Sequence, residues 1–233
     1  SENNAELAGV VASDFTLVGD VRDASIQTQN YMNGEEVDEF IYALSIVGIG
    51  MTVATVASAG GAAPAKVGVS VLKTAKKTGQ LSSNLARNLS RMLGDAVDTK
   101  TFRNNVKDIQ YHEVGRFKDE VMKLFKTAKT DEIQTVFKDV KKISDATSVS
   151  DTAKILKYAD NTDDIRRLGK LSSDFGENSL AVLKVLGKGT LKLTKTIAKS
   201  IYNLFAALAA LMYAILTTII GFILKIRLLL KIA

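Results

Sequence analysis

An uncharged and strongly apolar run near the C-terminal end most constrains how this chain can fold. From Ser200 to Leu224 there are 25 residues without a single Asp, Glu, Lys or Arg. As a helix this run would be about 37 Å long, enough to cross a hydrocarbon core of about 30 Å with some tilt. A membrane-spanning helix is therefore predicted, in preference to a buried core helix of a soluble protein. The residues expected inside the bilayer are Ile201, Leu204, Leu208, Leu211, Ile215, Ile219 and Leu224.

The residues after this run favour a single crossing. Gly221 is the only possible turn, and the chain beyond it is too short to return through the bilayer. Three cations, Lys225, Arg227 and Lys231, lie in this tail. They are predicted to stay at the membrane surface, because a cation in hydrocarbon is costly and long cationic side chains reach toward water.

A second uncharged run, from Phe40 to Ala59, is about as long as a minimal membrane span. It is rich in small residues such as Gly48 and Gly50, which allow close helix packing but lower the hydropathy. Gly60, Gly61 and Pro64 end it, and a shorter amphipathic segment follows. Membrane insertion of this run is predicted, and a buried helical hairpin in a soluble core is the alternative.

Four lysines precede the C-terminal run at spacings of four, three and four residues: Lys188, Lys192, Lys195 and Lys199. On one continuous helix these spacings place all four side chains on the same face. A basic amphipathic helix that leads into an apolar run is typical of an element lying on an anionic membrane surface. The alternative is a solvated lysine face of a bundle helix.

The rest of the chain indicates helices. The sequence contains one proline and no cysteine, and apolar residues between positions 80 and 176 recur at spacings of three and four. The predicted fold is all-α, a helical membrane protein with a soluble helical region between two apolar segments. Four parts are expected: acidic N-terminal helices in 1–39, the small-residue-rich apolar segment with an amphipathic helix in 40–79, a soluble helical region in 80–176, and the basic amphipathic helix with the transmembrane helix in 177–233.

The sequence offers little catalytic chemistry. His112 is the only imidazole and has no spaced carboxylate partner, so a helix-face or surface position is expected rather than a catalytic base or metal ligand. The stretch LGKGT, from Leu186 to Thr190, lacks the glycine spacing of a phosphate-binding loop, and its glycines are expected to break a helix. The carboxylate pairs Asp20 with Asp23 and Asp163 with Asp164 coincide with predicted helix starts, where capping explains them. No catalytic residue, cofactor or metal site is therefore expected, and no enzyme.

The charge distribution indicates the class of partner. The net charge is +6, and the lysines lie beside apolar runs rather than in loops interleaved with aromatic residues. This distribution favours an anionic lipid bilayer over nucleic acid. No signal peptide is expected, because the N-terminal stretch is polar and acidic.

The stretch SDFTLVGDVRDASIQTQNYMNGEEVDEFIYALSIVGIG, within residues 13–75, resembles the pre-toxin segments of bacterial polymorphic toxins. In that family a VGD-x-[KR]-D turn precedes an apolar stretch rich in small residues. The resemblance implies a bacterial protein of toxin type and transfers no catalytic residue. In the family an enzyme domain usually follows, whereas this chain continues to an apolar helix.

Two functions remain open from the sequence. The first is a membrane-inserting or pore-forming bacterial effector, acting on anionic lipid through both apolar runs, with homo-oligomers or other subunits as partners. The second is a resident protein of the bacterial inner membrane whose helical region docks partner proteins. A soluble helical binding module is a third, less favoured interpretation.

Overall fold

The computed structural model describes residues 17–110, 112–125, 131–192 and 195–230, and every regular element within them is helical. The all-α prediction is confirmed. The α-helices are α2 (Leu17–Met32), α3 (Glu39–Ala57), α4 (Ala63–Lys77), α5 (Ser83–Ala96), α6 (Thr99–Val106), α7 (Val114–Phe125), α8 (Asp131–Ala146), α9 (Val149–Leu156), α10 (Thr162–Phe175), α11 (Ser179–Leu186) and α12 (Lys195–Leu230). Two short 3₁₀ helices, η1 (Gly176–Asn178) and η2 (Lys188–Lys192), flank α11.

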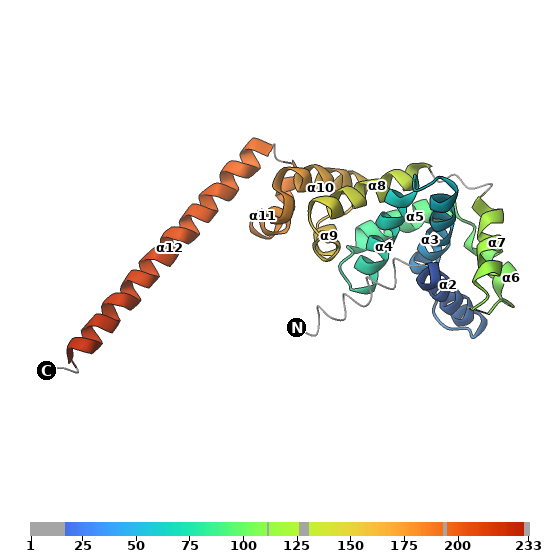
Figure 1. Ribbon diagram of the computed structural model, residues 1–233, viewed down its shortest axis with the longest axis horizontal. Helices are drawn as coiled ribbons and strands as arrows, with labels where there is room; N and C mark the ends of the chain where they lie inside the picture. The colour runs from blue at the N-terminus through green and yellow to red at the C-terminus, as the bar shows by residue number, and fades with distance from the viewer. Residues whose placement is uncertain (1–16, 111, 126–130, 193–194, 231–233) are drawn as a thin grey trace.

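One hydrophobic core joins α2 through α11. Its buried side chains extend from Val21 to Leu183, so the core includes residues from all four parts expected from the sequence. α3 lies at the centre of one half and packs against α2, α4, α5 and α7 (Figure 1). α4 also packs on α8, which in turn contacts α10 and so connects to the second half. We call this body, residues 17–192, the helical domain.

Close backbone approach determines how α4 crosses α8. A Cβ atom on Gly68 would overlap the carbonyl oxygen of Phe137 and would lie 2.6 Å from its carbonyl carbon. Only glycine permits this crossing, because any side chain would push the two helices apart. The crossing fixes the position of α4, whose lysines face α2.

The helix starts differ in part from the sequence expectation. Asp20 was expected at a helix start, but α2 runs unbroken from Leu17 through Asp20. Asp38 caps α3 by accepting a hydrogen bond from the Ile41 N–H. Ser148 and Asn161 cap α9 and α10 in the same way, so capping chemistry does open those helices.

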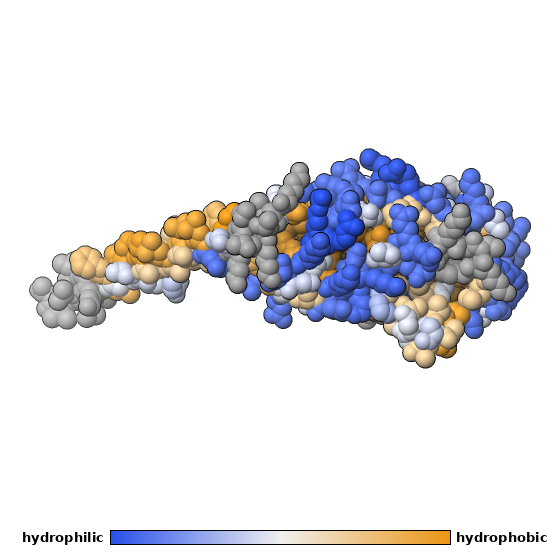
Figure 2. Space-filling view, turned by 90° about the horizontal axis from the view of Figure 1, so that it is seen from above, coloured by the Kyte–Doolittle hydropathy of each residue, from blue (hydrophilic) through white to orange (hydrophobic). Residues whose placement is uncertain are grey.

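α12 is set apart from this packing. The 36-residue helix extends away from the helical domain as a single rod, and only its first turns lie near α10 and α11 (Figure 1). The rod carries an apolar surface along much of its length, whereas the domain surface is mostly hydrophilic (Figure 2).

Candidate membrane segment and buried ion cluster

The predicted membrane-spanning residues lie on the exposed part of α12. Between Ser200 and Leu224 no part of the most apolar window is buried, and the mean hydropathy reaches 2.3. Of the predicted set, Ile201 is half-buried, and Leu204, Leu208, Leu211, Ile215, Ile219 and Leu224 are exposed. Large apolar side chains on every side of a helix are unfavourable in water and suit a lipid environment. By length and composition α12 can cross a membrane.

A small apolar contact holds the first turns of α12 to the helical domain. The rings of Phe175 on α10 and Tyr202 on α12 meet edge to face, with centroids 6.2 Å apart. Such a pair adds about 0.5–1.5 kcal/mol to the burial of the two rings. This contact joins the start of α12 to α10.

The four predicted surface lysines do not share one helix, so that part of the sequence interpretation is wrong. α11 ends at Leu186, and Gly187 follows at a φ of 65°, a backbone conformation that favours glycine and stops the helix. Lys188 and Lys192 then begin and end η2, while Lys195 and Lys199 belong to α12. The expected helix break at the LGKGT glycines is confirmed at Gly187. The four lysines all follow this break, and they are divided because η2 ends at Lys192 and α12 begins at Lys195.

Of these lysines, Lys188 has a described side chain, and it forms an ion pair with the exposed carboxylate of Asp160. Lys225 and Arg227 continue α12, and Lys231 lies outside the described residues. A membrane-surface role for the lysine set stays a prediction.

The first apolar run forms α3, and the structure has the buried arrangement that was the alternative to a membrane span. α3 also has the length and composition of a span, with a mean hydropathy of 2.0, but 67% of its most apolar window is buried. From Phe40 to Met51 every side chain lies inside the helical domain. The polar Ser45 hydroxyl donates to the carbonyl oxygen of Ile41, so it does not oppose this burial.

A buried ion cluster lies where α2 and α4 face each other across α3. Asp20 and Asp23 on α2 meet Lys66, Lys73 and Lys77 on α4. The Lys73 ammonium is fully buried, at 2.8 Å from Oδ1 of Asp20 and 2.7 Å from Oδ2 of Asp23. Lys66 pairs with the other oxygen of Asp20, and Lys77 lies 2.7 Å from Oδ2 of Asp23. We call these five residues the ion cluster.

The members of the ion cluster differ in how burial and charge balance. Burial raises the pKa of Asp20 despite the nearby charges of Lys73 and Lys66, whereas charge prevails at the other two groups described next. Burial alone would raise the pKa of Asp23, but the charges of Lys73 and Lys77 and their hydrogen bonds lower it to about 2. Burial likewise lowers the pKa of Lys73, but Asp20 and Asp23 outweigh it and raise that pKa above its ordinary value. Both Asp23 and Lys73 therefore stay charged near neutral pH.

Gly48 on α3 makes room for the ion cluster. A Cβ atom there would overlap the carboxylate of Asp20 and would lie 2.6 Å from its Cγ. The small residues of α3, which suggested close packing in a membrane, thus serve close packing against a buried carboxylate.

Sequence reasoning missed the ion cluster because it assigned Asp20 and Asp23 to helix capping. A signal was present in the spacings. Asp20 and Asp23 are three residues apart on one helix, and Lys66, Lys73 and Lys77 share a face of the next amphipathic helix. The sequence did not indicate that the aspartate face of α2 and the lysine face of α4 both turn toward the core instead of toward water.

The other polar residues singled out in the sequence lie at two separate places in the described part of the chain. His112 is exposed in the turn between α6 and α7. Asp163 pairs with Arg166, and Asp164 accepts a hydrogen bond from the Asp160 N–H. Among the described residues, no three His, Asp or Glu side chains gather in a way that could hold a metal ion.

Comparison of the chain with protein-family models, with curated proteins and with solved structures finds no match. The resemblance to pre-toxin segments therefore stays a prediction from the sequence alone.

Proposed function

We propose that the chain is a non-enzymatic membrane-inserting protein in which α12 crosses the bilayer once and holds the helical domain at the surface. The observation that carries this proposal is a 25-residue apolar segment that is exposed from Leu204 to Leu224 and stands beside a domain with its own core. Because the domain buries its apolar residues without α12, α12 is free to use its whole circumference on lipid.

In this proposal the helical domain binds partner proteins at the membrane face, as a resident of the bacterial inner membrane. Its exposed apolar side chains include Val18 and Met32 on α2, at 63% and 57% exposure. The basic residues around the start of α12 favour an anionic leaflet.

Membrane extraction tests the proposal. Membranes from cells that express the full chain are washed with alkaline carbonate, and the chain should remain in the pellet. The double variant Leu208→Arg/Ile215→Arg should move it to the supernatant, because an arginine near the centre of a span costs about 2.5–3.5 kcal/mol.

Arginine at Val18 and Val185 is the matched control. Both side chains are exposed apolar residues on the helical domain, at 63% and 49% exposure. That double variant should stay in the pellet. Equal release of both double variants would contradict a span at α12.

A second candidate function is a pore-forming effector of bacterial competition, and α3 is the observation that favours it. A second helix of span length inside a folded domain is what a protein needs if it is to insert further after reaching a bilayer. In this version α3 leaves the core, joins α12 in the membrane, and oligomers open a leak.

Dye release separates the two candidates. Purified full-length protein is added to vesicles that contain anionic lipid and an entrapped dye. Release that rises steeply with protein concentration, together with growth inhibition on expression, supports the effector. Stable insertion without release supports the resident protein.

A further inference from the structure

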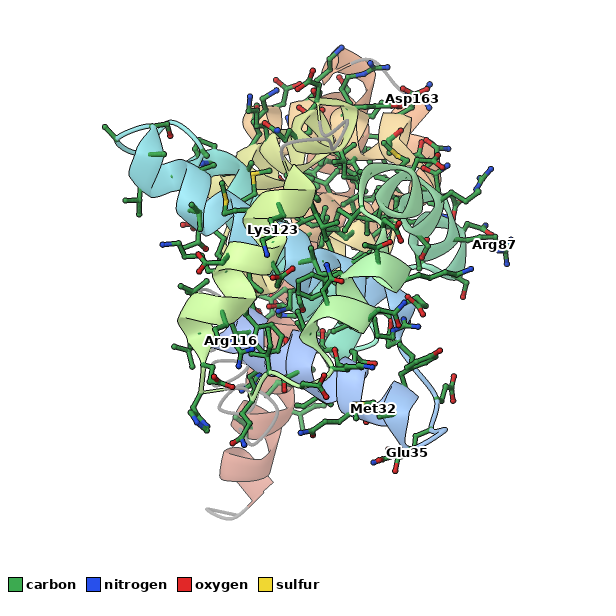
Figure 3. All side chains as sticks on the ribbon, turned by 90° about the vertical axis from the view of Figure 1, so that its right-hand side faces the viewer. Met32, Glu35, Arg87, Arg116, Lys123 and Asp163 are labelled. Carbon is green, nitrogen blue, oxygen red and sulfur yellow. The ribbon has the colours of Figure 1, made fainter. Side chains whose placement is uncertain are left out.

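The turn between α3 and α4 projects from the helical domain as an uncharged apolar tip. The chain has no charged residue from Phe40 to Ala65, and α3 changes from buried to half-buried after Met51 and to exposed at Val56. We call residues Thr52 to Pro64 the hairpin tip. Val56 is its most exposed large side chain, at 81%. The α3–α4 hairpin extends sideways from the body in Figure 3, and an apolar protrusion is visible at one edge of the domain in Figure 2.

The backbone of the hairpin tip satisfies its own donors. The N–H groups of Ser58, Ala59, Gly60, Gly61 and Ala63 all donate to carbonyl oxygens within the tip, at 2.8 to 3.3 Å. The Ala62 N–H donates to the Ser58 hydroxyl oxygen at 3.2 Å. The next residue, Pro64, has no N–H to satisfy, and it is the only proline in the chain.

The hydroxyl groups of the hairpin tip are also satisfied internally. Thr52 donates to the carbonyl oxygen of Gly48, Thr55 to that of Met51, and Ser58 to that of Ala54, at 2.6 to 2.9 Å. An exposed turn in water has no need of such a complete set, because water serves any donor left over. In a lipid environment each unsatisfied donor costs several kcal/mol, so a complete set is required.

We propose that the hairpin tip is a second membrane contact, which dips into the boundary between headgroups and acyl chains while α12 spans. Three features carry this proposal together: an exposed apolar turn, no charge over 26 residues from Phe40 to Ala65, and a backbone with internally paired donors. The proposal rests on the proposed function, because α12 brings the helical domain to the bilayer.

A lipid partner fits these features better than a protein partner. Protein interfaces have a polar rim whose groups pair across the contact. The donors of the hairpin tip are instead paired within the hairpin, and the tip has no charged side chain to pair with a partner protein. Its Ala and Gly residues present little side-chain surface to fill a protein pocket. The contact is shallow, since Val53 and Val56 are the only large apolar side chains between Thr52 and Pro64.

The absence of cysteine in the chain allows a direct test. Single-cysteine variants of the full chain carry an environment-sensitive fluorophore and are reconstituted into vesicles with anionic lipid. Val56→Cys reports on the hairpin tip, Leu216→Cys on the middle of α12, and Asp163→Cys on an exposed site at the start of α10. Nitroxide-labelled lipids, with the nitroxide at shallow or deep positions, serve as quenchers.

We expect the Val56→Cys label to emit at shorter wavelength and to be quenched by the shallow nitroxide about twofold or more over the Asp163→Cys label. The Leu216→Cys label should respond most to the deep nitroxide. If the Leu216→Cys label is quenched and the Val56→Cys label behaves like the Asp163→Cys label, the proposed membrane contact of the hairpin tip is wrong and the proposed span by α12 is supported. If only Val56→Cys is quenched, the proposed span is wrong and the contact stands. If neither is quenched, both are overturned.

A wavelength shift at Val56→Cys without quenching by either nitroxide would place the hairpin tip against protein and overturn the lipid assignment.

A charge substitution in the hairpin tip provides a second test of the lipid contact. In an Ala57→Cys background, Val56→Lys should reduce shallow quenching to the Asp163→Cys level. Val18→Lys makes the same replacement at an exposed apolar position on α2, and it should leave that quenching unchanged.

Discussion

α3 and α12 pass the same test for a membrane span, yet the structure places them in opposite environments. Their mean hydropathies are 2.0 and 2.3, and their most apolar windows are 67% and 0% buried. α3 has small residues at close crossings, such as Gly48 beneath Asp20. In α12 the large apolar side chains face every direction, and Gly221 has no neighbour that needs its space. The difference teaches that hydropathy alone does not distinguish a buried apolar helix from an exposed one, whereas the placement of small and large side chains does.

The surroundings of the two helices differ as well. α3 is enclosed by helices that are held in place by charged side chains, since α2 and α4 meet through the ion cluster. α12 has one ring contact at its first turns. A span-length helix is thus buried here because amphipathic neighbours with buried ion pairs surround it.

Removing α12 gives the largest expected effect on this comparison. A chain that ends before Ser200 should leave the membrane fraction entirely, because the other apolar helix is enclosed in the domain. Fractionation measures the location. A cooperative thermal transition by circular dichroism serves as the control for folding. Retention of this folded, shortened chain on membranes would show that α3 or the hairpin tip binds lipid by itself.

Lys73→Met tests how firmly α3 is enclosed. The substitution leaves Asp20 and Asp23 without their shared buried partner, and such a loss costs about 3–5 kcal/mol of unfolding free energy. Denaturant unfolding of the full chain in detergent measures it. The control is Arg166→Met, which removes an exposed pair with Asp163 and should cost about 1 kcal/mol or less. Equal costs for the two variants would contradict a structural role of the ion cluster.

Gly48→Ala tests the close packing that distinguishes α3 from α12. The added methyl group overlaps the Asp20 carboxylate, and overpacking of this kind costs about 1–3 kcal/mol. Gly94→Ala in α5 is the matched control, since a Cβ atom there meets nothing within 4 Å. It should stabilise the protein by up to about 1 kcal/mol through helix propensity. Stabilisation by both alanines would mean that Asp20 does not lie over α3.

Acid should loosen the enclosure of α3 through Asp23. Its pKa is lowered from 3.8 to about 2, so its stabilising contribution is present above pH 4 and is lost as the pH falls toward 2. The loss amounts to about 2 kcal/mol. The difference in unfolding free energy between the wild-type chain and Asp23→Asn, followed from pH 5 to pH 2, isolates this fall from the opposite contribution of Asp20, whose pKa is raised by burial. For Asp23→Asn the unfolding free energy should be lower at pH 5 and should fall less between pH 5 and pH 2. An equally steep fall in this variant would assign the acid effect to other carboxylates.

The smallest effect is expected at the junction between the helical domain and α12. Lys188→Ala removes an exposed pair with Asp160 and should change the unfolding free energy by about 1 kcal/mol or less. Its effect on vesicle binding should also be modest, about 1 kcal/mol per lysine near an anionic surface. Binding isotherms of the wild-type chain and of this variant measure it. Complete loss of vesicle binding in this variant would contradict the proposal that the apolar surface of α12 provides most of the membrane affinity.

The sequence predicted the elements better than their surroundings. The apolar period of three and four residues marked α5 and α8, and the charge-free runs marked α3 and α12, because these signals are local. The burial of α3 could not be predicted, since it depends on which helices surround it. The predicted lysine face is wrong because Lys188 and Lys192 belong to the 3₁₀ helix η2, whereas Lys195 and Lys199 belong to α12. The paired charges of Asp20 and Lys73 were visible but required the tertiary fold to bring them together.

The order of α3 in the chain has a consequence for protein synthesis. α3 is complete at Ala57, whereas α7, the last of the helices that pack directly on it, ends at Phe125. At about 5–20 residues per second, the ribosome needs about 3–14 s to make the 68 residues between these points. During that interval a nascent helix that could enter a bilayer has only part of its covering. We therefore expect slower translation to lengthen the time for which α3 is incompletely covered.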